Sequence, residues 1–86
     1  MSWYIYIIQS ITDGDYYKGI SENVEKRLAE HNAGLSTFTS TKSPWKLVYV
    51  AAMETKRDAI IEEKRIKKLN RTSLERIIHS DKNITI

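Results

Sequence analysis

Cysteine is absent from this chain of 86 residues, proline occurs once and glycine three times. Without cysteine, neither a disulfide nor a thiolate metal site can hold the fold together, and a reducing cytoplasm is the compartment that we expect. No apolar run approaches the ~18 residues that a membrane span needs, and the first residues lack the basic and then apolar pattern of a signal peptide. We therefore expect a soluble protein that does not contact a membrane.

A strong charge imbalance is also missing, because 14 Lys and Arg stand against 11 Asp and Glu, for a net charge of +3. The basic residues nevertheless concentrate in the second half of the chain, at Lys56, Arg57, Lys64, Arg65, Lys67, Lys68, Arg71 and Arg76. Such a cluster suits contact with phosphates, although a solvated basic helix face is the simpler explanation from charge alone.

Apolar runs and helix-period patterns alternate along the chain without a linker or repeat. They predict strands at 3–9, 15–20 and 46–52 and helices at about 23–33, 56–69 and 74–79. Gly34 lies where a left-handed residue would end the first helix, and a Thr72-x-x-Glu75 capping box would start the last one. The length fits a single domain, 1–86, with a loose tail at 80–86. The predicted fold class is α/β, a central three-stranded antiparallel sheet flanked by helices.

The first two strands carry tyrosines whose position depends on the loop between them. Tyr6 and Tyr17 share one face of the hairpin if that loop has an even number of residues. A two-residue Asp13-Gly14 turn would leave them four rungs apart, roughly 13 Å, so we expect a longer loop. Gly19 would leave a gap on the same face, into which a phosphate could approach the backbone. The alternative is that both tyrosines are ordinary strand aromatics.

The next helix places two polar side chains on its apolar stripe. Arg27 and His31 are one turn apart, together with Val24 and Leu28, because residues three and four apart are neighbours on a helix. The pair can therefore reach one pocket. The alternatives are a surface arginine that packs its stem on the sheet edge and a purely structural histidine. His79 has no such neighbours, and we assign it no role.

Glu62 and Glu63 are adjacent in the long helix, so only one should face inward. Three of the four nearest helical neighbours of Glu63 are apolar, and we expect this carboxylate to lie nearer the core. An acid there needs a cation, a metal or a hydrogen-bond donor, and an Arg27–Glu63 salt bridge is one alternative. A single inward carboxylate disfavours a two-metal site and allows one hard divalent ion that keeps several waters.

Together these motifs resemble the core of a GIY-YIG nuclease. The resemblance rests on Tyr4-Ile5-Tyr6, Tyr17-Lys18-Gly19 and the Arg27/His31 pair, continues through Thr39, 44–49 and the acidic helix, and covers about 3 to 69. It is close to the small stand-alone subfamily. The first motif departs from the family because it does not begin with glycine, and Asn70 comes earlier than the asparagine that many members carry.

The resemblance implies one active site that hydrolyses a DNA phosphodiester with a single Mg²⁺ or Mn²⁺, built from Tyr6, Tyr17, Arg27, His31 and Glu63. Tyr6 or His31 would be the general base, Tyr17 would orient water, and Glu63 would hold the metal. Arg27 would stabilise the charge on the phosphoryl oxygens. We expect the tips of these five side chains to converge on one concave surface.

The expected function is a divalent-dependent DNA endonuclease that acts on repair or branched DNA, with a further protein as a candidate source of specificity. Five basic residues are expected to track the DNA backbone beside the site: Lys56, Lys64, Lys67, Lys68 and Arg71. The first alternative is a nucleic-acid-binding module with weak or no catalysis. The second is an interaction protein in which the tyrosines and Glu63 only pack.

Overall fold

Three strands and three α-helices form this protein in a computed structural model that describes residues 2–35, 39–80 and 83–84. In chain order the elements are β1 (Trp3–Ser10), β2 (Tyr16–Ser21), α1 (Val24–Asn32), the short 3₁₀ helix η1 (Ser40–Lys42), β3 (Trp45–Met53), α2 (Lys56–Lys67) and α3 (Arg71–Ile78). The strands make one antiparallel sheet in the order β2-β1-β3. This confirms the predicted α/β fold with a three-stranded sheet between helices.

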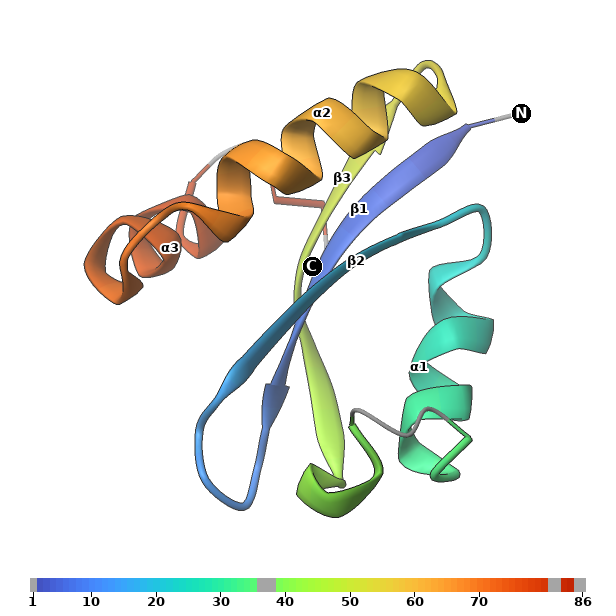
Figure 1. Ribbon diagram of the computed structural model, residues 1–86, viewed down its shortest axis with the longest axis vertical. Coiled ribbons are helices and arrows are strands. Elements are labelled where there is room, and N and C mark those ends of the chain that lie inside the picture. Colours follow the sequence, from blue (N-terminus) through green and yellow to red (C-terminus); the bar gives the residue numbers. More distant parts are fainter. Residues whose placement is uncertain (1, 36–38, 81–82, 85–86) are drawn as a thin grey trace.

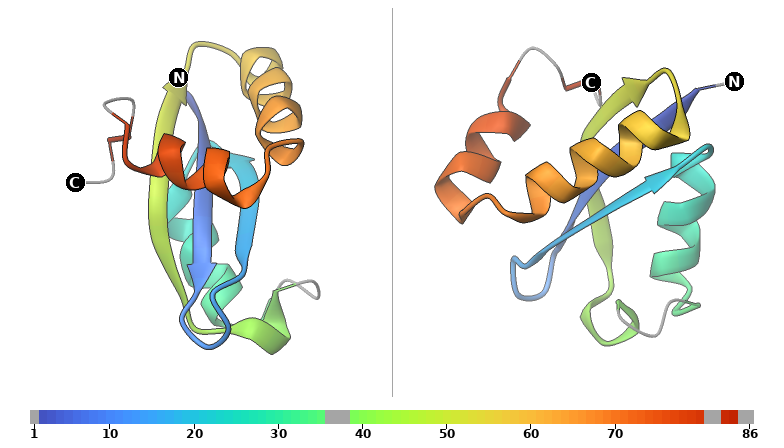
Figure 2. Two further views of the ribbon diagram at one scale, coloured as in Figure 1. Left: turned by 90° about the vertical axis from the view of Figure 1, so that its left-hand side faces the viewer. Right: turned by 45° about the horizontal axis from the view of Figure 1, so that its top comes forward.

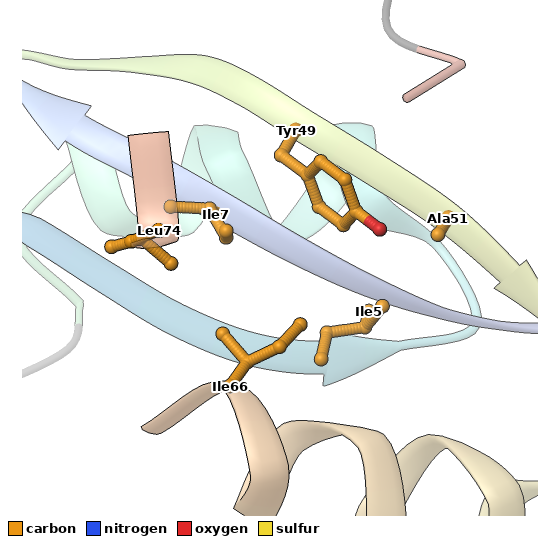
Figure 3. Packing of buried hydrophobic residues seen from close by; sticks show 6 residues of the cluster. All are labelled: Ile5, Ile7, Tyr49, Ala51, Ile66 and Leu74. Atoms are coloured by element: carbon orange, nitrogen blue, oxygen red, sulfur yellow. The ribbon is translucent and has the colours of Figure 1, made fainter. Parts of the chain in front are cut away.

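The two faces of the sheet are covered by different helices (Figures 1 and 2), so the central strand is buried on both sides. Ile5 and Ile7 of β1 pack against Ile66 of α2 and Leu74 of α3, as Figure 3 shows. The side chains that alternate with them, Tyr6 and Ile8, point to the face covered by α1. Tyr6 therefore lies in the α1 layer, and α2 belongs to the other layer.

The β1–β2 loop sets the register of the hairpin. The Ser10 N–H donates to the carbonyl of Asp15 at 2.8 Å, and this bond encloses four residues, 11–14, in which Gly14 adopts a φ of 81°. Tyr6 then pairs with Gly19, and Ile8 pairs with Tyr17. The expected longer loop is confirmed, and the two tyrosines are diagonal neighbours on one face of the sheet.

The helix ends agree with the sequence in the first two helices and differ in the third. The Asn23 side chain caps α1, Thr55 caps α2, and Gly34 follows α1 with a φ of 78°. The predicted Thr72-x-x-Glu75 box was wrong, because α3 begins one turn earlier and the Asn70 side chain accepts from the Ser73 N–H at 2.9 Å. Asn70 is therefore a helix cap.

Part of the C-terminal tail contacts the sheet, although we expected the tail to be loose. The Asn83 amide accepts from the Val50 N–H at 3.2 Å and donates to the Val48 carbonyl at 2.8 Å, and the Ile84 N–H donates to the Val50 carbonyl at 2.9 Å. These bonds satisfy backbone groups on the outer edge of β3. The remaining residues of the tail beyond Ser80 lie outside the described ranges.

Candidate active site

A buried chain of three polar side chains lies at the centre of the α1 layer. The Tyr6 hydroxyl is 3.0 Å from Nε2 of His31, and Nδ1 of the same imidazole is 2.7 Å from Oγ1 of Thr39. Tyr6 is 1% exposed, and His31 and Thr39 are 0% exposed. These three side chains come from β1, α1 and the segment before η1, so one hydrogen-bonded path links three separate parts of the sequence.

Gly19 makes room for the Tyr6 ring on the edge strand. A Cβ atom at Gly19 would lie 2.5 Å from the Tyr6 hydroxyl oxygen and 2.7 Å from Cζ. Real Cβ atoms essentially never come so close, so the ring occupies the space that any other residue would need. The gap expected at Gly19 therefore holds the tyrosine itself, and its hydroxyl ends over the edge strand β2.

Tyr17, which lies on β2 two residues before Gly19, packs against the same imidazole. Its ring meets His31 edge to face with centroids 4.9 Å apart, and it meets Trp45 at 6.5 Å. Such edge contacts fix ring orientation and contribute about 0.5–1.5 kcal/mol beyond area burial. Tyr6, Tyr17 and His31 thus form one aromatic cluster, as the motif spacing predicted.

Arg27 lies one turn before His31 and turns toward the Tyr6 hydroxyl. Its guanidinium is 2.7 Å from the Glu30 carboxylate, an ion pair on the surface of α1. The Glu30 contact, with a smaller contribution from Tyr6, raises the pKa of Arg27. Sequence reasoning missed the Glu30 contact, which the spacing of three residues on one helix could have indicated.

The electrostatics keep both members of the Tyr6–His31 pair neutral. Burial raises the pKa of Tyr6 above its ordinary value of 10.0, against the opposing hydrogen bond and charge of Arg27. Burial and the Arg27 charge lower the pKa of His31 below its ordinary value of 6.5. At neutral pH the site therefore contains a phenol and an uncharged imidazole within hydrogen-bonding distance.

Glu63 reaches this region from the opposite layer. It lies on α2, and its negative charge adds a small contribution to the raised pKa of Tyr6, of which burial is the main cause. Its carboxylate is 3.6 Å from Nζ of Lys67. The alternative Arg27–Glu63 salt bridge does not form, because Arg27 pairs with Glu30 and Glu63 pairs with Lys67.

Burial does not separate Glu63 from its neighbour, contrary to expectation. The side chains of Glu63 and Glu62 are 19% and 21% exposed. They differ in direction, because Glu62 forms two hydrogen bonds with Arg65 at 2.6 and 2.8 Å, and its charge adds to the burial that raises the pKa of Tyr49 on β3. Glu63 instead acts on Tyr6. The two acids therefore serve opposite edges of the sheet.

Four of the five expected side chains gather in the α1 layer, and Glu63 approaches them around β2. The expected single concave surface was wrong. Three hollows border β2 instead: one of about 480 Å³ lined by Tyr16, Tyr17, Lys18 and Lys67, one of about 350 Å³ that includes Trp3 and Arg27, and one of about 210 Å³ that includes Tyr17 and Trp45. None of the three is lined by Tyr6 or Glu63. Figure 1 looks onto this edge, with α2 and α1 on either side of β2.

The five basic residues expected to bind DNA are all exposed: Lys56, Lys64, Lys67, Lys68 and Arg71. Two of them lie next to β2, because Lys67 lines the hollow with Tyr17 and the Arg71 guanidinium stacks over the Tyr16 ring at 5.0 Å. Lys56 lies at the other end of the sheet, 5.2 Å over the Trp3 ring. The positive charge therefore borders the site on its α2 side.

The described residues include no group of three or more His, Cys, Asp or Glu side chains that could hold a metal ion. A hard divalent ion does not need such a group when waters and a substrate phosphate complete its oxygen shell. The Glu63 carboxylate, only 19% exposed and close enough to influence Tyr6, is a suitable single protein ligand. The residues present therefore fit one divalent ion.

Residues 2–76, which contain every one of these groups, match the model of the GIY-YIG catalytic domain. The chain belongs to the GIY-YIG family. A UPF0213 protein of Bacillus licheniformis is 42% identical to it over 78 residues, 90% of this chain and 79% of the relative. A UPF0213 protein of Halobacterium salinarum is 37% identical over 73 residues, 84% of this chain and 94% of the relative.

A solved structure agrees with this assignment. The solution NMR structure of a UPF0213 protein from Bacillus halodurans matches with a TM-score of 0.61 and 29% identity, over 95% of this chain and 87% of that one. The GIY-YIG domain implies nuclease-like activity on DNA, and GIY-YIG nucleases generally use divalent metal ions. The names of the UPF0213 relatives state no activity. In the described residues, no helix is both long and apolar enough to cross a membrane.

Proposed function

We propose that this GIY-YIG protein is a divalent-metal-dependent DNA endonuclease that hydrolyses phosphodiester bonds in branched or repair-type DNA. The observation that carries the proposal is the Tyr6 hydroxyl, which lies over the edge strand at Gly19, 3.0 Å from Nε2 of His31, and is acted on by the charge of Arg27. A hydroxyl with a base on one side and a fixed cation on the other is suited to take a proton from water beside a phosphate.

The reaction is an in-line displacement in which the water oxygen bonds to phosphorus and the bond to the leaving oxygen breaks. The proton of the water passes to the Tyr6 oxygen as the phenol proton passes to Nε2 of His31, 3.0 Å away. Solvent then carries a proton from His31 to the leaving alkoxide. A relay is needed because the raised pKa of Tyr6 leaves almost no phenolate at neutral pH.

Ordinary pKa values show that this relay is energetically accessible. A phenol near 10 and an imidazole near 6.5 differ by about 3.5 units, so the proton transfer costs at least about 5 kcal/mol, because the raised pKa of Tyr6 and the lowered pKa of His31 both widen the gap. That is well below the ~16 kcal/mol barrier of a reaction that proceeds at about 10 s⁻¹. Tyr17 keeps the imidazole in place through its edge contact at 4.9 Å, and Arg27 stabilises charge on the phosphoryl oxygens.

Glu63 would hold the divalent ion, whose chemistry is to stabilise the negative charge of the leaving oxygen. We assign backbone contacts on the α2 side to Lys67 and Arg71, which border β2, and to Lys56, Lys64 and Lys68, which are exposed on the same helix or at its cap. Such contacts provide affinity without reading sequence. Preference for a branched structure would then come from DNA shape or from a protein partner.

The decisive experiment incubates the protein with duplex, nicked, flap, branched and single-stranded DNA in Mg²⁺, Mn²⁺ or chelator. We expect cleavage only with a divalent ion, and we expect Tyr6→Phe to slow it by about 100-fold or more because the proton acceptor is lost. Tyr4→Phe is the matched control, since Tyr4 lies on the same face of β1 two residues away. Equal rates for wild type and Tyr6→Phe would refute the proposed site.

The same panel separates the alternative function. If the protein binds DNA with a steep dependence on salt but cuts no substrate in either metal, it is a nucleic-acid-binding module and the endonuclease proposal fails. Cleavage that persists in chelator would show that the reaction does not need a divalent ion.

A further inference from the structure

We propose that Thr39 is a positioning residue, which fixes the tautomer of His31 and thereby turns the basic nitrogen of the imidazole toward Tyr6. This inference rests on the proposed function, because it assigns Thr39 a part in the proton relay of the same site. Thr39 does not touch the reacting atoms and acts only through His31, whose Nδ1 is 2.7 Å from Oγ1 of Thr39.

The tautomer follows from the donors and acceptors around Tyr6. A guanidinium has no acceptor, so Arg27, whose charge acts on Tyr6, cannot accept the phenol proton. The phenol proton must then find an acceptor, and Nε2 of His31, at 3.0 Å, is the one that lies within reach. If Nε2 carried the imidazole proton, the buried phenol O–H would lose this acceptor, at a cost of about 1–3 kcal/mol.

The proton of a neutral His31 therefore belongs on Nδ1, where it too needs an acceptor. Oγ1 of Thr39 meets that need at a distance typical of a strong hydrogen bond, and both residues are completely buried. Removing the Thr39 oxygen would leave the Nδ1–H unsatisfied and favour the opposite tautomer, in which Nε2 is a donor. An Nε2 donor cannot accept the phenol proton, so the relay would be interrupted.

The position of Thr39 is itself fixed by the surrounding structure. The Trp45 indole N–H donates to the Thr39 carbonyl at 3.0 Å. The Asn32 side chain in turn accepts from the Trp45 N–H at 2.6 Å and donates to the Trp45 carbonyl at 3.1 Å. The last residue of α1 and the first of β3 thus hold Thr39, the acceptor, in place. This network indicates that the orientation of His31 is set by hydrogen bonds rather than by incidental packing.

The test measures the tautomer directly, by ¹⁵N NMR of the two imidazole nitrogens at pH 7.5. Wild type should show His31 protonated on Nδ1. Thr39→Val, which keeps the shape and removes the oxygen, should convert a large part of His31 to the Nε2 protonated form. Thr39→Ser, which restores the hydroxyl, should return the wild-type spectrum. His79 is exposed and serves as an internal reference that should not change.

Cleavage measured on the same samples provides the second readout. Thr39→Val should lower kcat by about 10-fold, the size of one unmade buried hydrogen bond, with KM unchanged, and Thr39→Ser should recover it. An unchanged His31 tautomer in Thr39→Val would overturn the inference, as would a changed tautomer with full cleavage. Thr39→Ala gives the same two readouts if the valine packs poorly, as judged from the dispersion of the amide spectrum.

The two proposals fail in different ways. If wild type cuts no DNA, the proposed function fails, whereas the NMR measurement still decides whether Thr39 sets the tautomer. If wild type cuts and Tyr6→Phe does not, but Thr39→Val behaves like wild type in both readouts, only the role of Thr39 is refuted.

Discussion

Replacing Gly19 with alanine tests the geometry on which the proposed reaction depends. The added Cβ would lie 2.5 Å from the Tyr6 hydroxyl oxygen, and ordinary contact begins at 3.4 Å, so the oxygen has to move by about 0.9 Å. The rigid, buried ring cannot make that shift and keep its 3.0 Å hydrogen bond to His31. A misplacement of about 1 Å costs roughly 100-fold in rate, so we expect Gly19→Ala to cleave about 100-fold more slowly.

Stability should fall at the same time. Overpacking costs about 1–3 kcal/mol and a broken buried hydrogen bond about as much again, whereas alanine in a strand gains about 0.5–1 kcal/mol over glycine. We expect a net loss of about 1–5 kcal/mol in the free energy of unfolding, measured by urea denaturation. Since a change of 1 kcal/mol shifts Tm by about 4–8 °C in a domain of this size, thermal melts would show the effect clearly.

A double-mutant cycle identifies the cause. In a Tyr6→Leu background the shorter side chain does not reach over the edge strand, so Gly19→Ala should be neutral or slightly stabilising there. The coupling energy between the two positions then equals the cost of the steric conflict. If Gly19→Ala destabilised both backgrounds equally, or left the wild type unaffected, the assignment of Gly19 as the space for the Tyr6 ring would be incorrect.

Three further predictions concern the acid, the basic helix and the histidine. Glu63→Gln should abolish divalent-dependent cleavage with an unchanged melting temperature. Glu62→Gln should keep the activity and, because its surface ion pair is lost, reduce the stability by under about 1 kcal/mol. Equal activity of both variants would remove Glu63 from the site. Changing Lys67 and Lys68 together to Gln should weaken DNA binding and reduce the slope of log K against log salt by about 1.8, and an unchanged slope would place DNA elsewhere. The folded pKa of His31 lies below 6.5, so its neutral form should stabilise the protein above pH 6.5. This contribution should be lost as the pH falls, by at most about 1.4 kcal/mol per pH unit. Urea denaturation at pH 7.5 and 5.5 should show the loss in wild type and not in His31→Gln.

Periodicity predicted those parts of the site that depend on one element or one hairpin. Side chains alternate along a strand, so loop parity alone placed Tyr6 and Tyr17 on one face, and the helix repeat placed Arg27 beside His31. These relations involve neighbours within a few residues or across one turn. They are set by backbone geometry before any long-range packing occurs.

Relations between layers could not be predicted in the same way. The helix repeat gives the rotation of Glu63 about the axis of α2 but not which face of the sheet α2 covers, and the two adjacent acids turned out almost equally exposed. Thr39 lies in a turn-like segment eight residues after His31, where no period links the two side chains. The capping box failed because Asn70, an equally good cap, is available two residues earlier.

The position of the Tyr6 hydroxyl over an edge strand restricts how this protein can assemble. Edge strands commonly recruit an additional strand from another chain, because their outer backbone groups are open to pairing. On β3, Asn83 and Ile84 satisfy part of that edge. A strand added to β2 would lie between α1 and α2, beside the proposed site. If cleavage takes place there as proposed, dimerisation through β2 and cleavage would exclude each other, and a peptide that pairs with β2 would act as a competitive inhibitor.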